Sequence, residues 1–213
     1  MAIDTRRLIL EKSYVLFQRQ GYSATSMRQI ALACGISVGN LCYHFKKKED
    51  LFMSFYMELF TTFSQNLGPT SDVDLDPWVG FIAREYCFLY KCAFDSDFRD
   101  SYTEAINIPT LRDEYIRLHD ERFRDIFGPD RLPAATREVH TASVVVCAAE
   151  FQLMDAYARH GDGTGFDDWF APVFHVHMGL LGVPQPEQDA RILKGFAVGK
   201  EIYGRTVFDG ITT

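Results

Sequence analysis

The sequence lacks the short motifs by which common enzyme classes are found. It contains no G-x-x-x-x-G-K phosphate loop and no H-E-x-x-H zinc helix. A di-iron carboxylate bundle needs Glu-x-x-His pairs, and none of the 6 histidines follows a glutamate at that spacing. We therefore expect no enzyme, no catalytic residue, no metal site and no cofactor.

The sequence also lacks paired cysteines, a leader and a membrane span. Its 5 cysteines are scattered with no C-x-x-C, which argues against a disulfide framework and a zinc knuckle. The first residues are charged too early for a signal peptide, and the longest uncharged run, residues 169–186, holds three prolines and two histidines. These absences predict a cytoplasmic protein with no membrane partner.

Acidic residues are nearly absent from the first 48 residues. They hold eight bases and only two acids, for a net charge of +6, whereas the remaining 165 residues carry −13. This division is typical of a polyanion-binding head on an acidic body that keeps the molecule off other polyanions.

Apolar residues recur at helical spacing throughout, with no sustained strand alternation, so the pattern predicts an all-α fold. The proline-bounded, acidic segment 68–77 is the first clear loop. Helices are expected near residues 4–20, 27–34, 38–45, 47–66, 77–94, 96–107, 110–127, 134–160, 167–182 and 186–206.

The two short helices in the head predict a helix-turn-helix. Ser26 and Gln29 have the spacing of a capping box, Gly35 follows the first short helix, and Ser37 can cap the second. Such a motif places its second helix in the major groove of DNA, while basic side chains and helix starts hold phosphates. The expected DNA-binding residues are Thr25, Ser26, Arg28, Ser37, Val38, Gly39, Asn40, Tyr43, His44 and Lys48.

Four pieces of residues 9–52 carry a family resemblance: LFQRQGY, ATSMRQIA, CGISVGNL and YHFKKKEDLF. Together they resemble the DNA-binding head of the tetracycline-repressor (TetR) family. One position departs from the pattern, because members usually carry tyrosine where Cys42 stands. The resemblance implies a helix-turn-helix domain over residues 1–48, a ligand-binding and dimerisation domain over residues 49–213, and a helix from about 47 to 66 that links them.

The resemblance further implies a homodimer, and the helix near 134–160 offers a stripe for it. Small residues in this stripe would admit a close approach of two helices, although periodicity alone equally allows a place in the core of one chain. The candidate interface residues are Val144, Cys147, Ala148, Phe151 and Met154.

A small-molecule site in the body is expected from aromatic residues with polar tips and from charge in apolar helices. Glu150 could receive a cationic or hydrogen-bonding ligand, or could pair with Arg84 or another interior base. The aromatic candidates could equally be plain core, and His119 could be an ordinary satisfied histidine. The candidates are Tyr86, Tyr90, Tyr102, Tyr115, His119, Glu150 and Tyr157.

These observations predict a ligand-responsive transcriptional regulator, with repression favoured. The homodimer would bind a palindromic double-stranded operator and leave it when a small molecule shifts the population of conformations. The alternative is an all-helical enzyme or protein-interaction module that does not use its helix-turn-helix on DNA.

Overall fold

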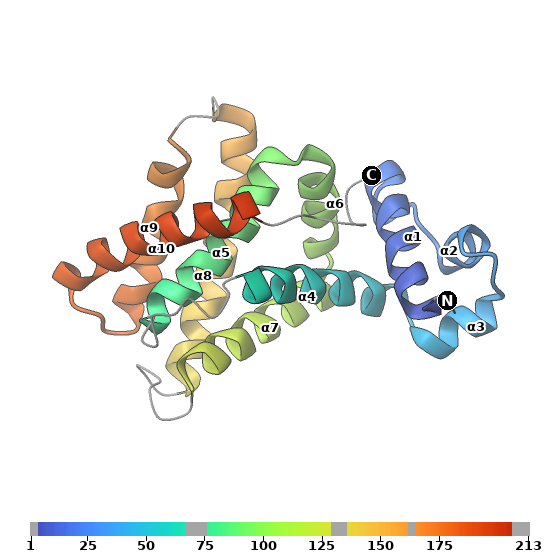
Figure 1. Ribbon diagram of the computed structural model, residues 1–213, viewed down its shortest axis with the longest axis horizontal. Helices are drawn as coiled ribbons and strands as arrows, with labels where there is room; N and C mark the ends of the chain where they lie inside the picture. Colours follow the sequence, from blue (N-terminus) through green and yellow to red (C-terminus); the bar gives the residue numbers. More distant parts are fainter. Residues whose placement is uncertain (1–3, 67–75, 129–135, 162–164, 206–213) are drawn as a thin grey trace.

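The computed structural model describes residues 4–66, 76–128, 136–161 and 165–205. These residues contain helices and no strand, so the predicted all-α class is confirmed for them (Figure 1). The helices are α1 (Thr5–Gln20), α2 (Met27–Ala33), α3 (Val38–His44), α4 (Lys48–Asn66), α5 (Pro77–Phe94), α6 (Ser96–Ile106), α7 (Pro109–Phe127), α8 (Thr136–His160), α9 (Phe166–Leu180) and α10 (Gln185–Arg205).

The helix boundaries lie within about two residues of those predicted, because local caps set several of them. Asp4 caps α1, and Gly21 ends it with a positive φ of 85°. Asp95 caps α6 by accepting a hydrogen bond from the Phe98 amide. Three parts of the expected elements lie outside the described ranges: residues 68–75 of the polar loop, residues 134–135 of the eighth helix and residue 206 of the tenth.

Helices α1–α3 form a head at one end of the molecule, and α4 runs from this head into the body (Figure 1). Nearly all apolar side chains of α4 are buried, which explains why they exceed what one helix face needs. Tyr14 of α1 stacks on Phe55 of α4 with ring centroids 4.2 Å apart, and Phe55 also contacts Phe98 of α6. The apolar core is therefore continuous from the head into the body.

Helix α5 lies at the centre of the body and packs most extensively against α10. Two glycines of α10 make this approach close. A Cβ atom on Gly195 would lie 2.5 Å from Cγ2 of Ile82, and one on Gly199 would lie 2.7 Å from Cδ1 of Tyr86. Among the described helices, none combines the length and the apolar character needed to cross a bilayer.

Candidate functional site

The helix-turn-helix is built by caps at both of its helices. The Ser26 hydroxyl accepts a hydrogen bond from the Gln29 amide, and the Gln29 side chain accepts one from the Ser26 amide, which confirms the expected capping box. Gly35 turns the chain with a positive φ of 66°, and the Ser37 hydroxyl then caps α3 by accepting from the Asn40 amide at 3.1 Å. These local bonds fix the angle at which α3 leaves α2.

Helix α3 presents an uncharged outer face. Leu41 and Phe45 are buried and hold the helix against the head. Tyr43 is 85% exposed, and its ring meets the His44 ring edge to face at 5.2 Å. The outward residues that the sequence predicted for DNA contact are exposed: Ser37, Val38, Gly39, Asn40 and Tyr43; His44 is half-buried and Cys42 is also exposed.

Basic residues surround this face without entering it. Arg28 on α2 is exposed, as are Lys46 and Lys47 in the turn after α3. The guanidinium of Arg6 lies over the Phe45 ring at 5.0 Å, which places a further charge beside the carboxyl end of α3. The arrangement offers cations at the edges and neutral donors and acceptors in the middle, as a groove-reading helix requires.

Two residues predicted to contact phosphates, Thr25 and Lys48, form hydrogen bonds within the head. The Thr25 side chain is buried, and its hydroxyl donates to the Gly21 carbonyl at 2.8 Å, so this hydroxyl is not available to a phosphate. The Lys48 ammonium donates to the carbonyls of Tyr22 at 2.7 Å and Thr25 at 2.8 Å and lies over the Tyr22 ring. An ammonium has three N–H donors, so Lys48 retains one for an outside partner. Burial lowers the pKa of Lys48.

Comparison with known proteins identifies this head. The model of the family described as "Bacterial regulatory proteins, tetR family" matches residues 9–54. Residues 9–54 of the head are thus similar to the tetR family. A helix-turn-helix transcriptional regulator of Bacillus subtilis strain 168, YhgD, is 35% identical to this chain over 108 residues, which are 51% of this chain and 53% of YhgD. The chain thus spans about half the length of that relative.

Two further matches extend beyond the tetR-family head. The negative transcriptional regulator of the icaADBC biofilm operon, IcaR of Staphylococcus epidermidis, is 28% identical over 130 residues, covering 53% of this chain and 68% of IcaR. The solved structure of the fatty acid degradation regulator FadR of Bacillus halodurans aligns with a TM-score of 0.48 at 19% identity, over 87% of this chain and 98% of that chain. Both YhgD and IcaR are named as transcriptional regulators.

Glu104 of α6 joins the body to the tetR-family head. Its two carboxylate oxygens accept hydrogen bonds from the amides of Tyr22 at 2.7 Å and Ser23 at 3.0 Å, in the loop between α1 and α2. Burial raises the pKa of this carboxyl, but the hydrogen bonds from Ser23 and Tyr22 and the charge of Lys48 outweigh burial, so the net pKa is lowered. The contact spans more than 80 residues of sequence, and no local pattern marks Glu104.

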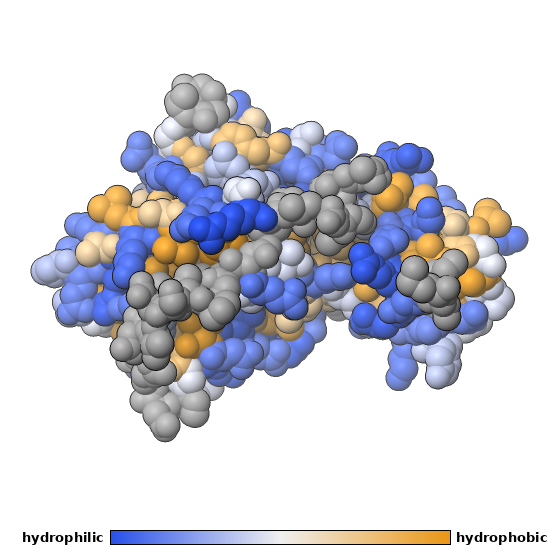
Figure 2. Space-filling model, viewed as in Figure 1, coloured by the Kyte–Doolittle hydropathy of each residue, from blue (hydrophilic) through white to orange (hydrophobic). Residues whose placement is uncertain are grey.

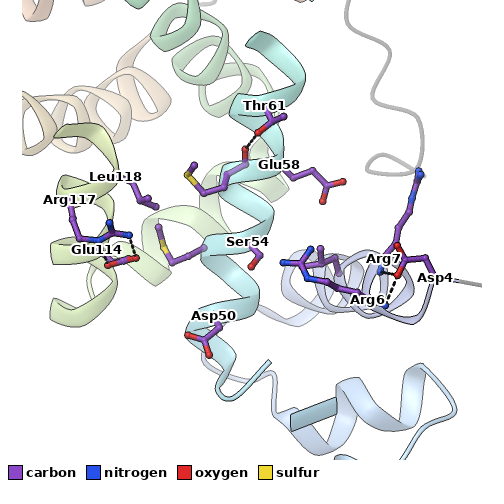
Figure 3. Close-up of a pocket in the computed structure, with 13 residues that line it drawn as sticks. Asp4, Arg6, Arg7, Asp50, Ser54, Glu58, Thr61, Glu114, Arg117 and Leu118 are labelled. Carbon is purple, nitrogen blue, oxygen red and sulfur yellow. Dashed lines mark hydrogen bonds and ion pairs between the residues drawn. The ribbon is translucent and has the colours of Figure 1, made fainter. Parts of the chain in front are cut away.

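A polar groove lies between the head and the body. It has a volume of about 610 Å³ and is lined by residues of α1, α4 and α7. Figure 3 shows Arg6 and Arg7 of α1 on one side of α4, and Glu114 and Arg117 of α7 on the other. The head therefore contacts the body through α4 and α6, while α1 and α7 remain apart across this groove.

The structure divides the predicted ligand residues into two groups. Tyr86, Tyr90 and Tyr157 gather around the ring of Phe166, with centroids 5.2, 5.2 and 5.9 Å from it. The second group consists of Tyr102, Tyr115, His119 and Glu150, which lie at the junction of α6, α7 and α8. There the Tyr115 hydroxyl donates to Glu150 at 3.3 Å, and the rings of Tyr115 and Tyr102 are 5.8 Å apart.

Two residues beside the second group, Glu85 and Arg122, were not predicted from the sequence. Glu85 of α5 is buried and accepts a hydrogen bond from the Arg122 guanidinium at 3.2 Å. Glu85 interrupts an apolar helix just as Glu150 does, so the signal used for Glu150 could have found it. Arg84 does not pair with Glu150, because its guanidinium donates to the Ser64 hydroxyl and the Gly80 carbonyl.

The predicted dimer stripe on α8 also divides into two faces. Cys147 and Met154 are buried in the core of the chain, so we withdraw them as interface residues. Val144 is 41% exposed, Ala148 is exposed and Phe151 is half-buried. A cavity of about 570 Å³ opens beside Val144, Ala148 and Phe151, between α6, α7 and α8.

Proposed function

We propose that this chain is a ligand-responsive transcriptional repressor that binds a palindromic DNA operator as a homodimer. The observation that carries the proposal is the exposed, uncharged face of α3, anchored by Leu41 and Phe45 and flanked by exposed bases, in a head that matches the tetR family. Repression is favoured because the relative IcaR is named as a negative regulator.

Asn40 and Arg28 would have different tasks on DNA. Asn40 stands on the outer face of α3, where its amide can pair with an adenine edge, whereas Arg28 stands on α2 at the border of that face. Ser26 and Ser37 each use their hydroxyl to cap a helix, so any phosphate contact there falls to the backbone amides of the helix starts. Lys48 would place its third N–H on a phosphate while holding Tyr22 and Thr25.

The test is fluorescence anisotropy on a DNA fragment selected from a random library, at several salt concentrations. Arg28→Ala should weaken binding on all sequences and reduce the salt slope by about 1, because one phosphate contact is lost. Asn40→Ala should cost about 1–3 kcal/mol and relax the base preference at one position. Arg137→Ala, on the exposed start of α8, is the charge-matched control and should change neither quantity. Binding that ignores salt would favour a protein partner instead.

The dimer would form through the exposed apolar side chains of α8, α9 and α10. Figure 2 shows hydrophobic residues gathered at the end of the body where α9 and α10 lie. Their exposed large members are Val144, Val145, Val176, Leu180 and Leu193. Two heads related by a twofold axis would reach successive major grooves about 34 Å apart.

The signal would travel through α6. This helix carries Tyr102, which contacts Tyr115 in the body, and Glu104, which holds the loop before α2. A ligand that moves Tyr115 would shift α6 and with it the head, and the groove between α1 and α7 would change its width. The ligand only needs to prefer the conformation whose two heads no longer match the operator.

A further inference from the structure

The strongest unassigned feature of the body is a buried polar cluster where α5, α7 and α8 meet. Among the described residues, Glu85, His119 and Glu150 each bring one ligand atom to within 4.8 Å of the others. All three side chains are at most 1% exposed. The proposed DNA binding does not use this cluster, and the family match, which covers residues 9–54, does not reach it.

Each member of the cluster is held by a partner through one atom and leaves another atom without one. Arg122 holds Oε1 of Glu85, Tyr115 holds Oε2 of Glu150, and the Ser143 hydroxyl lies 3.0 Å from Nδ1 of His119. Oε2 of Glu85, Oε1 of Glu150 and Nε2 of His119 are buried without a hydrogen-bond partner. Buried polar atoms are rarely left in this state, because each costs about 1–3 kcal/mol.

The distances suit a single small cation. Three atoms no more than 4.8 Å apart have a common point within about 2.8 Å of each, and shifts of under about 1 Å would bring them to the 2.0–2.2 Å of metal–nitrogen and metal–oxygen bonds. The partners already orient the side chains, as second-layer hydrogen bonds do in metal sites. Burial lowers the pKa of His119 well below its usual value, and His177 and Arg122 lower it further.

The charge of the cluster also calls for a cation. Two of its three side chains are carboxylates, and of these two only Glu85 forms an ion pair with a described residue, Arg122. A surface cavity of about 360 Å³ between α4, α5 and α7 is lined in part by Arg122, the partner of Glu85.

We propose that Glu85, His119 and Glu150 bind one divalent first-row transition-metal ion, and that this ion is the small ligand to which the repressor responds. The donor set of one imidazole and two carboxylates suits zinc, iron or manganese rather than calcium or magnesium. The second half of this proposal rests on the proposed function. The ion would act on Tyr115 through Glu150, and thereby on α6 and the head.

The first experiment measures metal binding without DNA. The full-length protein is titrated with Co²⁺ by absorption spectroscopy and with Zn²⁺ by equilibrium dialysis. We expect one ion per chain, loss of at least about tenfold in affinity for Glu150→Gln and for His119→Gln, and a loss of about 10–100-fold for Ser143→Ala. His140→Gln, which removes a histidine paired with Asp120 outside the cluster, and Cys42→Ser, which removes the exposed thiol, should bind as the wild type does.

X-ray absorption on the zinc-loaded wild type keeps the proposal testable if a variant does not fold. It should show one imidazole and oxygen ligands with no sulfur. Failure to bind Co²⁺ and Zn²⁺, or a zinc shell that contains sulfur, would overturn the metal site and leave the DNA-binding proposal standing.

The second experiment adds Zn²⁺ or Mn²⁺ to the protein–DNA complex. A drop of tenfold or more in DNA affinity that Glu150→Gln abolishes is expected. A metal that binds with unchanged DNA affinity would overturn the effector role, and a protein that binds metal but no DNA at all would contradict the proposed function while keeping the site.

Discussion

Glu104 is a single residue through which the body reaches the DNA-binding head. Its carboxylate accepts two backbone hydrogen bonds in the loop between α1 and α2 and lies against Gly21, where a Cβ atom would meet Oε2 at 2.7 Å. Glycine at position 21 therefore serves two purposes, because the turn needs a positive φ and the carboxylate needs the space.

Glu104→Gln should lower stability by about 1 kcal/mol at neutral pH, since an amide accepts only one of the two hydrogen bonds and the site is partly in water. The folded pKa of Glu104 is depressed, so its contribution is present above the unfolded value of about 4.5 and is lost as the pH falls through the folded value. Urea unfolding of both proteins from about pH 7 to pH 3 should show the difference shrinking as the pH falls. Glu58→Gln on the exposed side of α4 is the control, and a pH-independent difference would refute the assignment.

The exposed residues of α3 could be predicted from the sequence, whereas the polar side chains that form hydrogen bonds inside the protein could not. The caps at Ser26 and Ser37 are local and could be predicted from spacing of three residues. The roles of Thr25 and Lys48 depend on carbonyls in a turn whose path is set only when the head folds. Glu104 depends on an element more than 80 residues away, and a single sequence contains no signal for such a pairing.

At the scale of elements, the contact of α5 with α10 depends on the absence of side chains at Gly195 and Gly199. Gly199→Ala should destabilise the protein by about 1–3 kcal/mol, because the new Cβ would lie 2.7–2.9 Å from three atoms of Tyr86. Gly204→Ala in the same helix meets nothing within 4 Å and should be neutral or stabilising by up to about 1 kcal/mol. Urea unfolding measures both, and equal effects would contradict the close-approach argument.

The helices themselves were predictable, whereas the faces they bury were not. Periodicity and caps lie within each segment, so the expected ranges match α1 to α10 closely. Which side of α8 enters the core depends on α5, α7 and α9, and for that reason Cys147 and Met154 were misplaced in the dimer stripe. Glu150 was singled out correctly as unusual, but its neighbours Glu85 and Arg122 come from other helices.

At the scale of the whole molecule, the proposed dimer predicts that a substitution in its interface lowers the mass of the particle in solution from dimer to monomer. Leu180→Glu should convert the dimer to a monomer, because a charge on a 48% exposed side chain leaves the fold intact but opposes burial between two chains. Size-exclusion chromatography with light scattering gives the mass directly. Leu32→Glu, on α2 at an 80% exposed site in the head, should remain dimeric. A wild type that is already monomeric would refute the homodimer.

Helix α4 belongs to both ends of the molecule, and this limits how the protein can be taken apart. The side chains of Leu59, Phe60 and Phe63 are at most 2% exposed and are covered by the body rather than by α1–α3. A fragment that ends at Asn66 would expose these apolar side chains of α4 to water and should aggregate. Heating the intact chain should instead unfold the head and the body together in one cooperative transition. A synthetic regulator that uses this head must therefore also contain the body.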